Sequence, residues 1–192
     1  MRVLRLAVVM IILLGLIYPS AMTGLGMMLF PHQAKGSLVY DKTGKAVGSK
    51  LIGQRFTKEQ FFHGRPSSIQ YDASASGSPN YGPSNQELMK RMEKEAQQWT
   101  KKIHGIKKQD IPLDLLTNSG SGLDPHISPS AALFQVPMVA KATGLSENTL
   151  VRLVQKHTEG RTMGVFGEPR VNVLLLNMDV QRLMEEHSTH NE

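Results

Sequence analysis

Residues 6–30, LAVVMIILLGLIYPSAMTGLGMMLF, carry no formal charge, and this stretch decides the architecture of the chain. A helix suits it because a helix satisfies all of its own backbone hydrogen bonds within lipid. At about 1.5 Å per residue, such a helix is longer than the roughly 30 Å hydrocarbon core of a bilayer. We therefore expect residues 1–30 to form one N-terminal transmembrane anchor, with a kink at Pro19.

A cleaved signal peptide is the alternative for the same segment. Arg2 and Arg5 supply a basic start, residues 6–17 an apolar stretch, and Gly24-Leu25-Gly26 a small-x-small cleavage site. The apolar run continues beyond that site through Phe30, which favours a retained anchor. Lysine and arginine occur on both sides of the run, so charge alone does not fix its orientation. The long chain that follows favours a signal anchor with the N-terminus cytoplasmic and the C-terminal domain outside.

The composition of the whole chain sets broad limits. A length of 192 residues suggests one or two domains and excludes a large multidomain enzyme. The absence of cysteine excludes disulfides, thiolate metal sites and a cysteine nucleophile. The net charge of +6 is mild and does not indicate a nucleic-acid-binding surface. We expect residues 31–192 to form one domain of the α+β (mixed α/β) class with a small sheet.

Short apolar stretches predict the strands of this domain. Residues 36–48 read as a hairpin, with Gly44 in the turn. A second short strand is expected at residues 51–52. The almost continuous apolar run at residues 171–176 predicts a central strand that is buried on both faces. Residues 64–85 are rich in Ser, Pro, Gly and Asn and predict a long loop, which in a compact domain is usually functional or disordered.

The helix signals begin at Ser84, where Ser84-x-x-Glu87 matches a capping box. Apolar residues then recur at helical spacing, as Leu88, Met92, Ala96, Trp99 and Ile103.

Three further helices follow in the sequence. Ser128 and Ser146 have the chemistry of N-cap residues, and Asp179 is expected to cap a closing helix. Pro137 predicts a break or kink in the first of the three. The remaining end signals are glycines, Gly144 and Gly160.

One motif suggests phosphoryl transfer. Asp41-Lys42-Thr43-Gly44 matches the start of the phosphorylation signature of P-type ATPases, but the next residue of that signature is Thr and this chain has Lys45. Phosphoryl transfer also needs Mg²⁺ ligands and a nucleotide site, and a chain of this length has no room for those domains. We interpret the motif as a hairpin turn.

Residues 119–129, SGSGLDPHISP, form the most polar segment of the chain. Ser119 or Ser121, together with Asp124 and His126, supplies the residue types of a hydrolase triad. A triad requires these groups to meet in space, which closeness in the sequence does not establish. The alternative is a Gly-rich turn in which Asp124 caps the chain before Pro125.

No metal site is predicted, because the histidines do not cluster at ligand spacing. His157 is expected to interact with the end of a helix. Glu159, Arg161, Glu168 and Arg170 are expected to form structural ion pairs.

Several ordered motifs resemble a known family. They are Phe62-His-Gly-Arg-Pro-Ser67, Tyr81-Gly-Pro-Ser-Asn85, Ser119-Gly-Ser-Gly-Leu-Asp-Pro-His-Ile-Ser-Pro129, His157-Thr-Glu-Gly-Arg161 and Gly167-Glu-Pro-Arg-Val-Asn-Val173. Together, behind a single N-terminal span, they resemble the C subunit (KdpC) of the Kdp potassium-transporting P-type ATPase. The pattern departs from the family at Met138 and Thr143, where the family usually has arginine, so any role of those arginines does not carry over.

The resemblance implies a non-catalytic accessory subunit in the cell membrane, needed for assembly and activity of an ATP-driven potassium uptake complex. Its implied partners are a channel-like potassium-translocating subunit, a P-type ATP-hydrolysing subunit, a small stabilising peptide and membrane lipid. It implies no firmly bound cofactor, although an effect on ATP affinity through the position of Gln135 is described for the family. A membrane-anchored extracytoplasmic hydrolase is the rival function, and a nucleotide-binding module is a third.

We expect contact with these partners to use two groups of residues. Small residues of the span allow close helix packing, and polar residues of the loops reach the channel-like subunit. The predicted docking residues are Gly15, Ser20, Ala21, Gly24 and Gly26 in the span, and His63, Arg65, Asn85, Asp124, His126, Arg161 and Arg170 in the domain.

Overall fold

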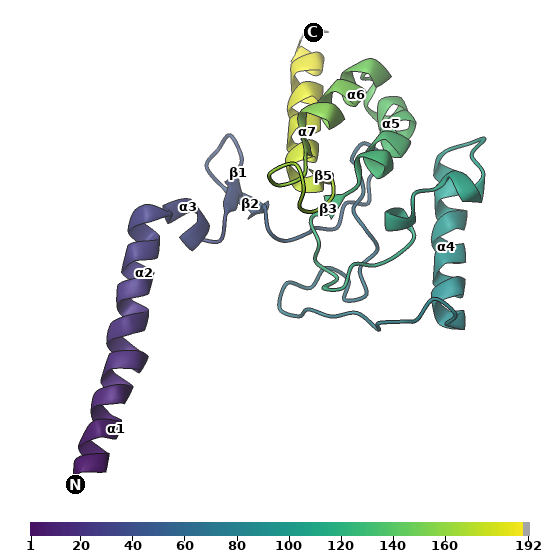
Figure 1. The fold of residues 1–192 in the computed structure, drawn as a ribbon. Helices are drawn as coiled ribbons and strands as arrows, with labels where there is room; N and C mark the ends of the chain where they lie inside the picture. Colours follow the sequence, from purple (N-terminus) through teal and green to yellow (C-terminus); the bar gives the residue numbers. More distant parts are fainter. Residues whose placement is uncertain (190–192) are drawn as a thin grey trace. The chain divides into compact units, whose positions relative to one another are not determined.

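The computed structural model describes residues 1–189 and divides into two compact units that meet between Ser49 and Lys50. Figure 1 shows the first unit in purple and blue and the second from blue through teal and green to yellow. The chain has the predicted apolar N-terminal helix followed by a mixed α/β domain with small sheets. The predicted domain boundary between residues 30 and 31 stays a prediction.

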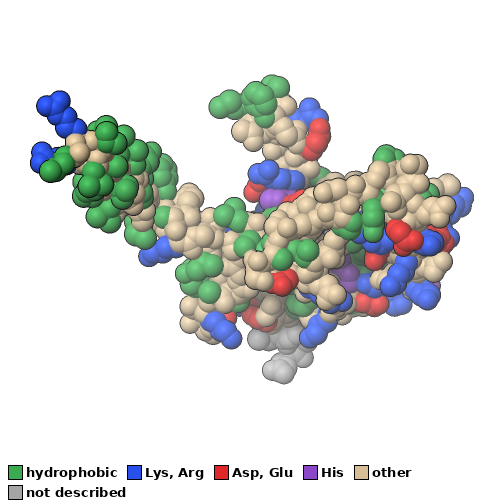
Figure 2. Space-filling view, turned by 90° about the horizontal axis from the view of Figure 1, so that it is seen from below, with side chains coloured by type: hydrophobic (Ala, Val, Ile, Leu, Met, Phe, Trp, Pro, Cys, Tyr) green, Lys and Arg blue, Asp and Glu red, His purple; other side chains and the backbone are tan. Residues whose placement is uncertain are grey.

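The first unit begins with a long apolar helix. It consists of α1 (Arg2–Ile12), a π-helical segment η1 (Leu13–Ile17) and α2 (Tyr18–Leu29). The span Arg2–Leu29 is long and apolar enough to cross a membrane, with a mean hydropathy of 2.2 and no buried residue. In Figure 2 apolar side chains cover this helix along its length, and basic side chains gather at its free end.

Pro19 changes the helix without breaking it. A proline inside a helix removes one N–H and crowds the preceding turn. Here the wider π turn comes directly before it, and the backbone N–H of Tyr18 donates to the carbonyl of Leu13, five residues earlier. The predicted disturbance is therefore a π segment inside a continuous helix.

The rest of the first unit is short. A single helical turn, α3 (Pro31–Ala34), leads to the predicted hairpin of β1 (Leu38–Tyr40) and β2 (Ala46–Ser49). Asp41 Oδ1 accepts hydrogen bonds from the backbone N–H groups of Thr43 and Lys45, at 2.8 and 3.0 Å. Gly44 supplies the positive φ of the turn, +79°. The phosphorylation-like motif is thus a hairpin turn.

The second unit begins with a loop that runs to α4 (Gln86–Lys102). After the 3-10 turns η2 (Lys108–Asp110) and η3 (Leu113–Leu115), the remaining elements complete the unit. They are β3 (His126–Ile127), α5 (Pro129–Thr143), α6 (Glu147–Lys156), β4 (Thr158–Glu159), β5 (Arg170–Asn172) and α7 (Val173–Thr189). The sheet is antiparallel in the order β3-β5-β4.

The core of the second unit lies between α5, α6, α7 and the small sheet. Helices α5 and α6 pack together and α6 packs on α7, as Figure 1 also shows. The fully buried side chains include Leu150, Val171 and Leu176. Helix α4 joins this core through Trp99, whose ring lies edge-on to that of Phe134 with centroids 5.8 Å apart.

The predicted boundaries of α4 need one correction. Asn85, not Ser84, is the N-cap: its side-chain oxygen accepts hydrogen bonds from the N–H groups of Glu87 and Leu88, at 2.8 and 3.3 Å. The predicted apolar face is confirmed, because Ala96, Trp99 and Ile103 are buried.

The prediction of a long central strand at residues 171–176 is wrong. Strand β5 ends at Asn172, and α7 begins at Val173. The reason is a cap inside the apolar run: the side-chain oxygen of Asn172 accepts a hydrogen bond from the N–H of Leu175, at 3.2 Å. Asp179 therefore lies inside α7 and does not cap it.

Smaller corrections concern α5, α6 and residues 51–52. Helix α5 continues through Pro137, which lies on its exposed side. It ends as predicted at Gly144, which has a φ of +74°. Helix α6 starts behind Ser146 as predicted, but it ends at Lys156, before Gly160. Residues 51–52 form a turn and bend in place of a strand, because the hairpin already ends at Ser49.

Candidate functional site

The long loop of the second unit is attached to the helices by two buried side-chain amides. Asn177 of α7 accepts from the N–H of Phe62 at 2.7 Å and donates to the carbonyl of Phe62 at 2.8 Å. Gln135 of α5 accepts from the N–H of His63 at 2.7 Å and donates to its carbonyl at 3.1 Å. Both amides are at least 98% buried, at 2% and 0% exposure.

These two amides stand in for a β-sheet partner. A buried backbone N–H or C=O must be paired, and leaving one unsatisfied costs about 1–3 kcal/mol. The loop has no strand beside Phe62 and His63, so the side chains of α5 and α7 supply the missing donors and acceptors. We call this pair of contacts, Gln135 with His63 and Asn177 with Phe62, the amide clamp.

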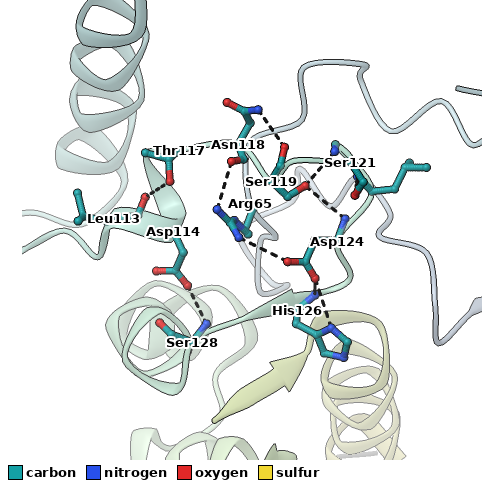
Figure 3. A network of polar contacts seen from close by, with 12 residues as sticks. Arg65, Leu113, Asp114, Thr117, Asn118, Ser119, Ser121, Asp124, His126 and Ser128 are labelled. Carbon is teal, nitrogen blue, oxygen red and sulfur yellow. Dashed lines mark hydrogen bonds and ion pairs between the residues drawn. The ribbon is translucent and has the colours of Figure 1, made fainter. Parts of the chain in front are cut away.

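Beyond the amide clamp the loop meets the polar turn at residues 118–124. Arg65 donates to the carbonyl of Asn118 at 3.2 Å and lies 3.5 Å from a carboxylate oxygen of Asp124. The other carboxylate oxygen of Asp124 accepts from the N–H of His126 at 3.0 Å and lies 3.3 Å from its Nδ1. Figure 3 shows Asp124 between Arg65 and His126.

The charge of Asp124 is favoured by this environment. Burial raises the pKa of the carboxyl group, but the hydrogen bonds of His126 and the charge of Arg65 outweigh burial, so the net pKa is lowered. Asp124 is therefore an ionised acceptor that connects the loop, the turn and β3.

The serines of the same turn bind backbone groups. Ser119 Oγ accepts from the N–H of Gly122 at 3.0 Å, and Ser121 Oγ accepts from the N–H of Leu123 at 3.1 Å. Among residues 1–189, neither serine hydrogen-bonds His126. The geometry thus matches a Gly-rich turn capped by Asp124 and not a hydrolase triad.

Two cavities adjoin this network. The first measures about 530 Å³ and is lined by Arg65, Asp124, His126 and Arg170, with Glu168 and Asp114 also on its wall. The second measures about 580 Å³ and lies between the loop and α4, where its wall includes His63, Arg65 and Trp99. Arg65 contributes to both.

The predicted docking residues fall into three groups. Arg65, Asp124, His126 and Arg170 meet around the 530 Å³ cavity. His63 is 8% exposed and lines the other cavity, while Asn85 caps α4. Arg161 pairs with both oxygens of Glu168 at 2.9 Å in an exposed connection.

The docking residues of the span do not contribute to a core. Gly15, Gly24 and Gly26 have open space where a Cβ would be added, and Ser20 and Ala21 are exposed. Close approach by another helix is therefore sterically free along this helix.

The sequence analysis gave no site role to several residues of this region, and it placed Trp99 only on the apolar face of a helix. Asn177, Tyr71, Trp99 and Lys102 all belong to it. The only available signal was Asn177, because a polar residue inside an apolar helix face is unusual unless it is hydrogen-bonded.

The side-chain amide of Gln135 is fully used in hydrogen bonds within the chain. Its amide also donates to Ala131 O at 3.2 Å, so a nucleotide would have to displace the amide clamp to reach it. Nearby, Met138 is buried in the core, and the Thr143 hydroxyl donates to Val139 O at 2.7 Å.

The predicted ion pairs of the C-terminal segment are confirmed. Arg170 pairs with Glu159 at 3.0 Å and Arg161 with Glu168 at 2.9 Å. His157 lies 2.9 Å from Asp179, a contact that the sequence did not predict. Burial raises the pKa of Asp179, but the hydrogen bonds of His157 and Lys156 lower it by more. The net pKa is therefore lowered, and the carboxyl group is ionised. Within the part of the chain that the structure describes, no group of three or more His, Cys, Asp or Glu is placed to hold a metal ion.

An apolar helix long enough to cross a membrane, followed by a mixed α/β domain, indicates the class of a membrane-anchored protein. The particular family follows from comparison with known proteins. The family model described as "KdpC: K+-transporting ATPase, c chain" matches residues 1–182. The chain belongs to this family, whose members are accessory subunits of the Kdp potassium-transporting ATPase.

Similar proteins align with this chain along nearly their whole length. The potassium-transporting ATPase KdpC subunit of Caldanaerobacter subterraneus subsp. tengcongensis is 50% identical over 186 residues, covering 97% of this chain and 96% of the relative. The KdpC subunit of Bacillus cereus (strain Q1) is 48% identical over 183 residues, with 95% of each chain covered. That of Bacillus mycoides is 49% identical over the same length, again with 95% of each covered.

Proposed function

We propose that this chain is a non-catalytic subunit of a potassium pump, in which the polar face around the 530 Å³ cavity contacts the channel-like subunit. The observation that carries the proposal is the contact of Arg65 with Asp124 at 3.5 Å, two residues along the chain from the amide clamp that holds Phe62 and His63. A surface ordered in advance loses less conformational entropy on association. The mixture of Arg65, Arg170, Asp124 and Glu168 on the cavity wall suits a polar, charge-complementary contact.

The apolar helix has a second role in this proposal. It anchors the chain in the cell membrane, with the N-terminus cytoplasmic and the second unit outside. Its small residues allow a neighbouring helix of the channel-like subunit, or the small stabilising peptide, to approach closely. The apolar residues that continue beyond the candidate cleavage site support anchoring. The P-type subunit belongs to the same proposed complex.

The effect on ATP affinity is a separate proposal. Because Gln135 is buried, we expect that any influence of this residue on the pump is indirect and passes through the amide clamp. Titration of ATP into the full chain should give no saturable binding that depends on Gln135. Saturable binding that is lost in Gln135→Glu would instead establish a direct nucleotide site.

Co-purification from detergent tests the proposed contact. Arg170→Glu reverses the charge at the cavity wall and should reduce recovery of the channel-like and P-type subunits with the tagged chain. Arg152→Glu makes the same charge change at an exposed position on α6, away from the cavity lining, and should leave recovery unchanged.

Two results would contradict the proposal. Equal recovery with both variants would remove the cavity face from the contact. Hydrolysis of ester substrates by the purified chain, abolished by Ser121→Ala, would favour the hydrolase reading.

A further inference from the structure

The second cavity, of about 580 Å³, has an excess of positive charge that the proposed function does not use. Its cationic side chains come from the loop and from α4, and Glu95 is the one carboxylate on its wall. The cationic residues are Arg55, Arg65, Arg91, Lys94 and Lys102. In Figure 2 basic side chains are gathered on the side of the molecule where α4 lies. We call this the basic cavity.

Most of this charge has no counter-ion within residues 1–189. Arg55, Lys94 and Lys102 form no ion pair there, and Arg65 has a single carboxylate, Asp124, at 3.5 Å. Arg91 donates only to neutral partners, Ser68 at 3.2 Å and the side-chain oxygen of Asn118. Three of the five cations, Arg65, Arg91 and Lys102, are partly buried. Partly buried cations with few compensating anions are costly unless something neutralises them.

Two arginines of the cavity also have an unused donor. The Nε atoms of Arg65 and Arg91 are buried and have no hydrogen-bond partner among the residues that the structure describes. Both guanidinium groups converge on Asn118, so they are held in place from one side. Their forks of N–H donors match the geometry of phosphate oxygens.

Lys102 lines the cavity, and no ion pair among the described residues neutralises its charge. Its Nζ lies 3.1 Å from Nδ1 of His63 and 5.1 Å from the centroid of the Trp99 ring. Burial, and then the charge of Lys102, lower the pKa of His63 to about 4, so this imidazole is neutral and accepts the hydrogen bond. Glu59 and Glu95 act on Lys102 electrostatically but form no ion pair with it among the described residues.

From these observations we propose that the basic cavity binds an oxyanion of the phosphate class. Five cations line the cavity, and two of them, Arg65 and Arg91, are guanidinium groups that Asn118 holds; together they supply the charge and the donor geometry. The phosphate can come from free inorganic phosphate or from the headgroup of an anionic phospholipid, and the chemistry at the site is the same. The inference goes beyond the proposed subunit contact, because it uses a different cavity.

Trp99 makes the binding directly measurable. It is the single tryptophan of the chain and it lines the basic cavity. The full chain, purified in a neutral maltoside detergent, is titrated with inorganic phosphate at constant ionic strength, and the Trp99 fluorescence is followed. A second titration uses phosphatidylglycerol in mixed micelles, with phosphatidylcholine as its neutral counterpart.

Matched charge reversals give the control. The double variant Arg55→Glu/Lys94→Glu changes two exposed cations of the cavity wall, and Lys101→Glu/Lys141→Glu changes two exposed cations outside it. All four side chains are exposed, so both variants should fold, which circular dichroism checks. We expect the cavity variant to weaken binding by about tenfold or more and the control variant by less than about twofold.

Each outcome decides the proposal. A saturable response to phosphate that the cavity variant loses supports a free-anion site, and a response to phosphatidylglycerol alone, lost in the same way, supports a headgroup site. No saturable response to either probe up to about 10 mM would overturn the proposal. Equal weakening in the two variants would also overturn it, because the charge effect would then be general.

Discussion

The apolar helix and the long loop solve the same backbone problem in opposite ways. The helix Arg2–Leu29 bonds its own N–H and C=O groups internally, so it needs no other part of the chain and none of its residues is buried. The loop at residues 50–85 has no helix or strand, and at Phe62 and His63 it borrows partners from α5 and α7. The loop therefore depends on the folded domain for its hydrogen bonds, whereas the side chains of the helix remain exposed and available for contact with other molecules.

Breaking the amide clamp should give the largest effect. Gln135→Met keeps the side-chain volume but leaves the N–H and carbonyl of His63 unsatisfied. We expect it to lower the free energy of unfolding by about 2–5 kcal/mol, measured by urea denaturation followed through Trp99 fluorescence. Gln155→Met, an exposed position on α6, should change stability by less than about 0.5 kcal/mol. Equal stability of the two variants would contradict the role of the amide clamp.

Acid should weaken the same region. Burial lowers the pKa of His63 from 6.5 in the unfolded chain to about 4, so the folded state favours the neutral ring. Below pH 6.5 the unfolded state binds the proton more readily, and stability therefore falls as pH drops from 6.5 towards 4. The contribution is at most about 3 kcal/mol.

A histidine substitution tests this origin. His63→Gln should flatten the loss of stability between pH 6.5 and 4, measured as urea midpoints across that range. His104→Gln, at an exposed histidine, should not. An unchanged pH profile in His63→Gln would assign the acid sensitivity to other groups.

A single methyl group should test how closely the loop meets the polar turn. A Cβ added at Gly53 would lie 2.6 Å from the backbone oxygen of Asp124, and the Gly53 N–H already donates to Leu123 O at 2.7 Å. Gly53→Ala should therefore cost about 1–3 kcal/mol of stability. Gly120→Ala has open space and a smaller expected cost, and thermal unfolding compares the two. A Gly53→Ala chain as stable as Gly120→Ala would mean that this contact is loose.

The smallest effect on stability is expected in the apolar helix. Gly24→Leu fills open space, so the domain should unfold as before, within about 0.5 kcal/mol. Recovery of the partner subunits in detergent should nevertheless fall, because a bulky side chain prevents close helix packing. Val9→Leu, an apolar exchange at an exposed position, is the control. Unchanged recovery with Gly24→Leu would show that this glycine does not lie at a helix contact.

Features set by local sequence were predictable. The hairpin turn at Asp41 and Gly44, the caps Ser128 and Ser146, and the apolar face of α4 follow from turn chemistry, capping and helical spacing. The resemblance to the KdpC family was recognisable from ordered motifs, and the family model that matches residues 1–182 agrees with it.

Features set by tertiary contacts were not predictable from pattern alone. The run at residues 171–176 has the hydrophobicity of a buried strand, and only the cap at Asn172 turns it into a helix. The roles of Gln135 and Asn177 depend on a loop more than 70 residues away in the sequence, at separations of 72 and 115. The basic cavity likewise joins Arg55 and Lys102 from segments whose meeting no periodicity indicates.

Hydrogen–deuterium exchange on the full chain, alone and in the assembled pump, tests the central claim most directly. The account predicts that residues 62–63 are protected in both states, because the amide clamp holds them without a partner. It predicts that residues 124–128 and 168–170, at the 530 Å³ cavity, exchange more slowly in the assembled pump than in the free chain. Unchanged exchange at these two segments in the assembled pump would contradict the proposed contact.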